Sequence, residues 1–155
     1  MTRRRIPRTA VRHRWLALVA AAIVLEPAPI VFAGGQQIAA EVAPDGKTIL
    51  VRTYRCGTPA SLTVTGTAEG LVQGQRRCIP LKIERSAEPA VFSVARQWPS
   101  EGAWVLTFTA AGERAASALV ELSAGSSLKI VSQESRYTPA ATREVEAALA
   151  RLAKR

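Results

Sequence analysis

Two cysteines are the first residues of this chain whose type and spacing suggest chemistry. Cys56 and Cys78 are the only cysteines among the 155 residues. An even cysteine count in an exported protein is typical of a disulfide bond, whereas redox pairs and haem attachment need a Cys-x-x-Cys spacing that is absent. The sequence therefore predicts a disulfide between Cys56 and Cys78, which would stabilise the fold by about 3 kcal/mol.

Two tryptophans beside a turn are the second feature that suggests chemistry. Trp98 and Trp104 flank the sequence Pro-Ser-Glu-Gly at residues 99–102. In one interpretation the two rings form a platform for a small ligand or a polysaccharide. In the other they close the hydrophobic core at a corner between two sheets. The side chains predicted to contact a ligand or partner are Trp98, Tyr54, Arg96, Arg76 and Arg77.

The residue types needed for the common catalytic sites are scarce. The single histidine, His13, lies in a segment that we expect to be removed, so Ser-His-Asp and Cys-His sites have no histidine. Phosphate-loop, dinucleotide and zinc patterns are absent. Glu84 and Glu88 are a candidate carboxylate pair, but their place at the end of a predicted strand is typical of solvated surface. We expect a protein that is not an enzyme and that uses neither a cofactor nor a metal.

The first 33 residues have the features of a secretory signal peptide. Six arginines and no acidic residue lie within residues 1–14, and the apolar run WLALVAAAIVL follows. Helix-breaking prolines and the sequence Val-Phe-Ala, which suits signal peptidase, complete the leader. The sequence predicts cleavage after Ala33 and a location in the periplasm or outside the cell.

Two other interpretations of this leader are open. An uncleaved anchor over residues 15–33 would be the only attachment to a membrane, although it would hold Glu26 and two prolines within the bilayer. The run Arg3-Arg4-Arg5 suggests twin-arginine export, although Ile6-Pro7 stands where that signal usually has an apolar pair.

Removal of the leader changes the argument from charge. The formal net charge falls from +9 to +4, because six arginines and Glu26 are lost with residues 1–33. Arginines recur through the rest of the chain, either on a solvated sheet face or as a patch that faces acidic lipid or polysaccharide. Nucleic acid is not an expected partner, because the protein is predicted to be exported and has no recognition helix or aromatic RNA motif.

The remaining chain has the alternation of an all-β protein. From residue 37 onward apolar residues recur with a period of two, and turn residues separate the runs. The sequence Pro-Asp-Gly-Lys at 44–47 predicts a hairpin turn, and AEGLVQGQ at 68–75 predicts an excursion between strands. We expect about eight strands, over residues 37–42, 48–54, 61–67, 77–84, 90–97, 103–110, 115–122 and 126–131.

The direction of the side chains favours a corner at residues 99–102. Large apolar residues occupy even positions on both sides of the turn: Phe92, Val94 and Trp98 before it, and Trp104, Leu106 and Phe108 after it. A tight hairpin would pair Trp98 with Ala103 and set the two apolar faces on opposite sides unless a bulge intervened. We therefore expect the chain to cross between two sheets here. Trp104 should lie in the core and Trp98 should stay partly exposed at the rim.

This corner carries a resemblance to a known group. The segment VFSVARQWPSEGAWVLTF is similar to the corner of small periplasmic immunoglobulin-like domains of the YtkA-like and FixH-like group. The resemblance implies an immunoglobulin-like fold outside the cytoplasm, often in accessory or metal-handling systems. Copper binding is not implied, because no histidine follows His13 and no methionine follows Met1. The expected fold is an immunoglobulin-like antiparallel β-sandwich over residues 34–132.

Residues 133–155 are predicted to form a linker and a short C-terminal α-helix. Thr138 is the expected N-cap and Pro139 the first helical residue. In one interpretation the helix packs on the sandwich or frays as a chain terminus, and in the other it docks a partner protein. Its predicted apolar face consists of Ala141, Val145, Ala148, Leu149 and Leu152.

These features predict a non-catalytic exported module of the cell envelope. We expect it to bind another envelope protein through a strand edge or the C-terminal helix. The alternative is a small-ligand or polysaccharide binder that uses the exposed aromatics and arginines.

Overall fold

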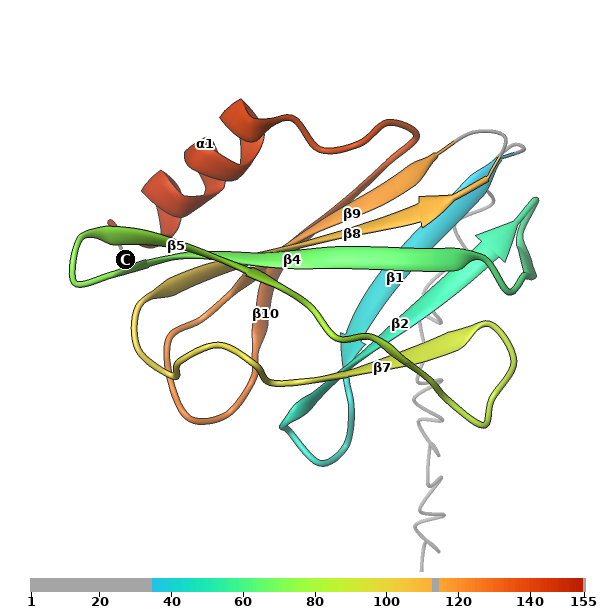
Figure 1. Ribbon diagram of the computed structural model, residues 1–155, viewed down its shortest axis with the longest axis horizontal. Coiled ribbons are helices and arrows are strands. Elements are labelled where there is room, and N and C mark those ends of the chain that lie inside the picture. Colours follow the sequence, from blue (N-terminus) through green and yellow to red (C-terminus); the bar gives the residue numbers. More distant parts are fainter. Residues whose placement is uncertain (1–34, 113–114, 155) are drawn as a thin grey trace, which may run out of the picture. The chain divides into compact units, whose positions relative to one another are not determined.

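The computed structural model describes residues 35–112 and 115–154, which form two antiparallel sheets and one helix (Figure 1). The predicted leader, residues 1–33, lies outside the described residues. The first sheet has the order β1-β2-β7-β6, with β3 paired to the end of β2. Its strands are β1 (Gln36–Val42), β2 (Thr48–Arg55), β3 (Thr58–Pro59), β6 (Glu84–Arg85) and β7 (Val91–Ala95).

The second sheet has the order β10-β9-β8-β4-β5. The strand orders match those of an immunoglobulin domain. The first sheet, β1-β2-β7-β6, corresponds to strands A-B-E-D, and β9-β8-β4-β5 of the second sheet corresponds to strands G-F-C-C′. The prediction of an antiparallel β-sandwich is therefore confirmed, and β10 is an additional strand beside β9. The strands of this sheet are β4 (Thr63–Val72), β5 (Gln75–Pro80), β8 (Ala103–Ala111), β9 (Ala116–Leu122) and β10 (Ile130–Arg136).

Alternating side chains from both sheets fill the space between them. Ile49 and Val51 of β2 face Leu106 and Phe108 of β8 across a single apolar core, and all four are fully buried. This is the period-two pattern that the sequence shows. The hairpin predicted at residues 44–47 is also confirmed, with Gly46 at a φ of 65°.

The predicted excursion at residues 68–75 is wrong. β4 continues to Val72, and a two-residue turn at Gln73 and Gly74, with φ values of 50° and 77°, returns the chain as β5. Positive φ at both central residues is the geometry that matches the twist of a tight hairpin. Gly70 suggests a loop in the sequence but lies inside β4. A glycine is needed at this position, because a Cβ would be 2.5 Å from the Trp104 ring.

The last strand also differs from its prediction. β10 begins at Ile130 instead of residue 126, because residues 123–129 form the loop between β9 and β10. Side chains of β10 cover the outer edge of β1. The Ala40 N–H donates to Gln133 Oε1 at 3.1 Å, and the Ser135 hydroxyl donates to the Ile38 carbonyl at 2.9 Å.

The predicted disulfide is wrong. Cys56 lies in the turn after β2 of the first sheet, and Cys78 lies in β5 of the second sheet. Both are exposed and neither is bonded. Cys78 pairs with Glu69, which in turn pairs with Val105 under the helix, so the Cys78 side chain is on the outer face of its sheet. Two thiols on separate sheets, one of them directed outward, lack the close approach of Cβ atoms that a disulfide requires.

The helix α1 (Thr142–Leu152) covers the outer face of the second sheet (Figure 1). Val145 and Leu149 pack against Val105 and Leu119 of the sheet, which confirms that its apolar face is packed on the sandwich. The helix of the described residues is too short and too polar to cross a lipid bilayer.

The predicted start of the helix is wrong by several residues. The N-cap is Ala141, and the Glu144 carboxylate accepts the Ala141 N–H at 2.9 Å. Thr138 instead belongs to the connecting segment, where its carbonyl accepts the Ser117 hydroxyl at 2.5 Å.

Candidate binding surfaces

The corner at residues 96–102 joins the two sheets, as the side-chain parity predicts. β7 ends in the first sheet and β8 begins in the second. Trp104 is 2% exposed, and its indole N–H donates to the Glu101 carbonyl at 2.7 Å. Trp98 is 4% exposed, so the expectation that it stays partly exposed is wrong. Because both rings belong to the core, this corner presents no aromatic platform.

Arg96 holds the corner in place. Its guanidinium donates to the carbonyls of Trp98 at 3.2 Å and Pro99 at 3.0 Å, within the corner. It also donates to the carbonyls of Gly125 at 2.7 Å and Ser126 at 3.1 Å, in the loop between β9 and β10. These four contacts use the planar fork of donors for internal structure.

The other predicted contact residues lie on separate surfaces. Arg76 donates to Glu69 Oε2 at 2.7 Å and to Glu146 Oε1 of α1 at 2.9 Å, so it joins the helix to the sheet. Arg77, its neighbour in β5, is exposed and its side chain is on the opposite face of the sheet. Tyr54 is half-buried on β2, beside β3. The structure therefore does not bring Trp98, Tyr54, Arg96, Arg76 and Arg77 together into one site.

Charged residues fasten α1 to the sheet beneath it. The deepest contact is that of Arg151 with Glu121, whose side chain is 2% exposed, and the Arg151 Nε donates to Glu121 Oε1 at 3.1 Å. The hydrogen bond from Arg151 and the charge of Glu121 raise the pKa of the guanidinium. Arg136 contacts Glu144 at the other end of the helix, and the Ala141 N–H together with Arg136 lowers the pKa of that carboxyl.

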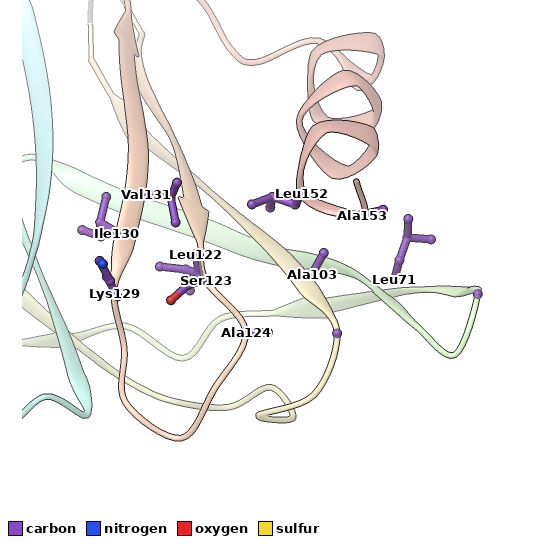
Figure 2. A pocket seen from close by; sticks show the side chains of 12 residues that line it. Leu71, Ala103, Leu122, Ser123, Ala124, Lys129, Ile130, Val131, Leu152 and Ala153 are labelled. Carbon is purple, nitrogen blue, oxygen red and sulfur yellow. The ribbon is translucent and has the colours of Figure 1, made fainter. Parts of the chain in front are cut away.

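An apolar hollow lies between the C-terminal end of α1 and the ends of the strands in the second sheet (Figure 2). Its volume is about 840 Å³. Lys129 is the only charged residue in its lining. The lining consists of Leu71, Gly74, Gly102, Ala103, Leu122, Ser123, Ala124, Lys129, Ile130, Val131, Leu152 and Ala153.

A β-bulge supplies one wall of this hollow. Ile130 pairs with Leu122 and Ser132 pairs with Glu121, so Val131 is an additional residue without a partner on β9. Such an insertion changes the direction of side chains locally. The hollow cannot be recognised in the sequence, because its lining residues come from five segments, most of which are distant in the chain. The two glycines, Gly74 and Gly102, are the only local signal.

The outer edge of β5 is the second candidate surface. β5 pairs with β4 on one side, and no strand lies on its other side within the described ranges. Val72 and Gln75, which flank the two-residue turn, form a hydrogen-bonded pair. Because hydrogen bonding alternates along an antiparallel ladder, the backbone N–H and C=O groups of Arg77 and Ile79 also point toward β4. The backbone N–H groups of Arg76 and Cys78 then point outward, and Pro80 occupies the next outward position, where a proline is tolerated.

Neither surface is assigned by comparison with other proteins. Comparisons of the chain with models of protein families, with curated proteins and with solved structures found no match. The described part of the chain contains no cluster of three or more histidine, cysteine, aspartate or glutamate residues that could hold a metal ion.

Proposed function

We propose that the protein is a non-catalytic exported module that binds another protein of the cell envelope. The open edge of β5 is the observation that supports this proposal. It offers two outward N–H groups, of Arg76 and Cys78, and the carbonyls of Arg76, Cys78 and Pro80 to an incoming strand. An extended segment that adds to a sheet edge gains main-chain hydrogen bonds in this way.

β5 differs from the other sheet edges in this respect. The edge of β1 is covered by side chains of β10, and β6 contains only two residues. β5 has six residues, and five of them are exposed. Long exposed edges are sites of strand pairing unless they are blocked.

The charge of β5 favours a partner with an acidic segment over a second copy of this chain. Arg76 and Arg77 are adjacent on the edge, and like charges that face each other across two strands are destabilising. Arg77 forms no ion pair within the described residues. An acidic side chain of the incoming strand would therefore find an unpaired guanidinium.

The alternative function as a small-ligand or polysaccharide binder has less support. Trp98 is buried and Arg96 is occupied by carbonyls, while Tyr54 lies on the other sheet from Arg76 and Arg77. Aromatic stacking on a sugar or a planar ligand needs an exposed ring.

The two natural thiols allow a matched test of the edge. In a Cys56→Ser variant, a benzophenone attached to Cys78 lies on the edge of β5; in a Cys78→Ser variant, the same group on Cys56 lies in the turn after β2. We expect irradiation in intact cells to give one predominant protein adduct from Cys78 and not from Cys56. Identical adducts from both positions, or none from Cys78, would contradict binding at this edge.

Replacement of the backbone donor makes the test specific. Cys78→Pro removes an outward N–H without removing a bond to β4, whereas Cys78→Val keeps that N–H. Once the crosslinked protein is purified, we expect Cys78→Pro to weaken its binding by about tenfold relative to Cys78→Val. Equal affinities of the two variants would exclude strand addition at β5.

A further inference from the structure

The hollow beneath the end of α1 has the size and lining of a site for a small apolar ligand. Ligand sites typically enclose about 300 to 1,000 Å³ and have mostly apolar walls with few polar groups, and this hollow of about 840 Å³ falls within that range. Leu152 of the helix and Ala103 of β8 point into it, and Val131 and Ile130 lie on its other side (Figure 2).

Two glycines and a β-bulge shape the lining of the hollow. Gly102 has a φ of 82°, and a Cβ at this position would be 2.3 Å from the Leu71 carbonyl oxygen. Gly74, with a φ of 77°, would place its Cβ in open space. Both glycines thus leave the rim free of side chains, and the bulge at Val131 adds an apolar side chain to the wall.

The backbone of the lining is already paired, which disfavours an extended peptide as the occupant. The Ser123 N–H donates to the Lys129 carbonyl at 3.0 Å, Leu122 pairs with strands on both sides, and Ala103 pairs with Leu71. A peptide laid in the hollow would find few free main-chain partners for its own amides, and unpaired buried amides are costly. A hydrocarbon chain needs none.

One charged residue of the lining indicates the head group of the ligand. Lys129 is the only charged residue among the described residues that line the hollow, and its ammonium forms no ion pair with any of them or with the rest of the described chain. Glu121, on the same face of the sheet, is occupied by Arg151, and Glu101 is outside the lining. Within the described lining, a carboxylate would therefore meet one positive charge that no acidic side chain pairs with.

From these observations we infer that the hollow binds a single acyl chain with an anionic head, of the fatty-acid class, and that Lys129 contacts the carboxylate. This inference is independent of strand addition at β5: the turn before β5 contributes Gly74 to the hollow, but Arg76 and Cys78, whose N–H groups point outward, are not part of the lining. The apolar lining holds the chain, and the lysine selects the charge of the head.

Calorimetric titration of the purified protein tests the inference with three probes that share one hydrocarbon chain. We expect dodecanoate to bind with one molecule per chain. Dodecylamine should bind at least about tenfold more weakly than dodecanoate, and the affinity of dodecanol should lie between the two. Absence of saturable dodecanoate binding to the folded protein, or equal affinities for the three probes, would overturn the inference.

Matched variants locate the binding. Lys129→Gln should weaken dodecanoate binding about tenfold and leave dodecanol unaffected, whereas Lys82→Gln, at an exposed lysine that pairs with Glu84, should change neither. Ala153→Phe should block the hollow, and Ala150→Phe, on the exposed side of the helix, should not. Equal effects within either pair would place the ligand elsewhere.

The same variants and probes distinguish two other possible occupants of the hollow. If the protein is dimeric, fails to bind dodecanoate and becomes monomeric on Ala153→Phe, a second copy occupies the hollow. If a short apolar peptide binds and dodecanoate does not, a protein partner does. Either result would overturn the inference.

Discussion

The two tryptophans of the corner are both buried, yet their indole N–H groups differ. Trp104 donates to the Glu101 carbonyl at 2.7 Å, whereas the buried Trp98 Nε1 has no hydrogen-bond partner among residues 35–112 and 115–154. Parity in the sequence was enough to predict that Trp104 lies in the core. It could not predict the burial of Trp98, because that depends on the loop between β9 and β10, which Arg96 draws over the corner.

The first prediction concerns these two rings. Trp104→Ala should reduce the free energy of unfolding by about 3 to 5 kcal/mol, because it removes a large aromatic side chain from the core. Trp104→Phe should cost more than Trp98→Phe, by about 1 kcal/mol, because only Trp104 loses a hydrogen bond. Denaturant unfolding of the variants measures both effects. A Trp104→Ala protein as stable as its parent would contradict the placement of this ring.

The second prediction separates backbone strain from steric overlap at a glycine. Gly102 and Gly57 have similar φ values, 82° and 78°, but only Gly102 has a close neighbour, the Leu71 carbonyl. Gly57→Ala should lower the free energy of unfolding by about 1 kcal/mol, from backbone strain alone. Gly102→Ala should lower it by at least about 1 kcal/mol more, because steric overlap is added to the strain. Equal losses in thermal or denaturant unfolding would show that the Leu71 carbonyl moves aside freely.

At the scale of elements, the helix was easier to predict than the hairpin of β4 and β5. Its apolar face follows largely from spacing alone: Val145, Ala148, Leu149 and Leu152 are buried as expected, whereas Ala141, which was predicted on the same face, is the exposed N-cap. Its first residue was predicted too early, because Thr138 is used in the connection to β9. The hairpin was missed because Gly70 is typical of loops in a sequence, whereas here it makes room for a ring from another strand.

The third prediction concerns the ion pair beneath the helix. Arg151→Ala leaves the Glu121 carboxylate, whose side chain is 2% exposed, without its partner and should clearly destabilise the fold. Glu121→Leu should cost distinctly less, because the Arg151 side chain is 50% exposed and can turn to water. Unfolding curves of the two single variants give this comparison, and a larger loss for Glu121→Leu would contradict the burial of that carboxylate.

The fourth prediction is a loosening of the helix in acid. The pKa of Glu144 is lowered in the folded protein from its ordinary value of 4.5, first by the Ala141 N–H and then by Arg136. The carboxylate therefore contributes stability above the ordinary pKa, and this contribution is lost as the pH falls through the lowered value. The protection factors of the amides in residues 142–145, which are corrected for the intrinsic pH dependence of exchange, should fall below about pH 4.

A control variant assigns that change to the carboxylate. In Glu144→Gln the side chain does not titrate, so the same residues should exchange faster near neutral pH and show a flatter dependence on acid. If the parent and the variant follow the same pH profile, another group controls the helix start.

At the scale of the whole molecule, the fold class was predictable and the surfaces were not. Period-two alternation and turn residues are local, so they indicate a sandwich directly in the sequence. The hollow and the open edge of β5 depend on which strands become neighbours, as does the separation of Cys56 from Cys78. Cysteine count carries no information on which sheet each thiol joins, and the predicted disulfide failed for that reason.

The last prediction combines the reactivity of the two unbonded thiols with cleavage of the leader, which stays a prediction. After export, the protein should begin at Gly34, as expected for cleavage after Ala33. Because Cys56 and Cys78 are exposed and unbonded, both should react with a thiol-specific alkylating reagent in the folded protein without reductant. Intact mass spectrometry reads the N-terminus and the two adducts together. A mass without adducts, lighter by the two hydrogens of a disulfide, would show that the two sheets approach each other differently, whereas an intact leader with two adducts would contradict cleavage alone.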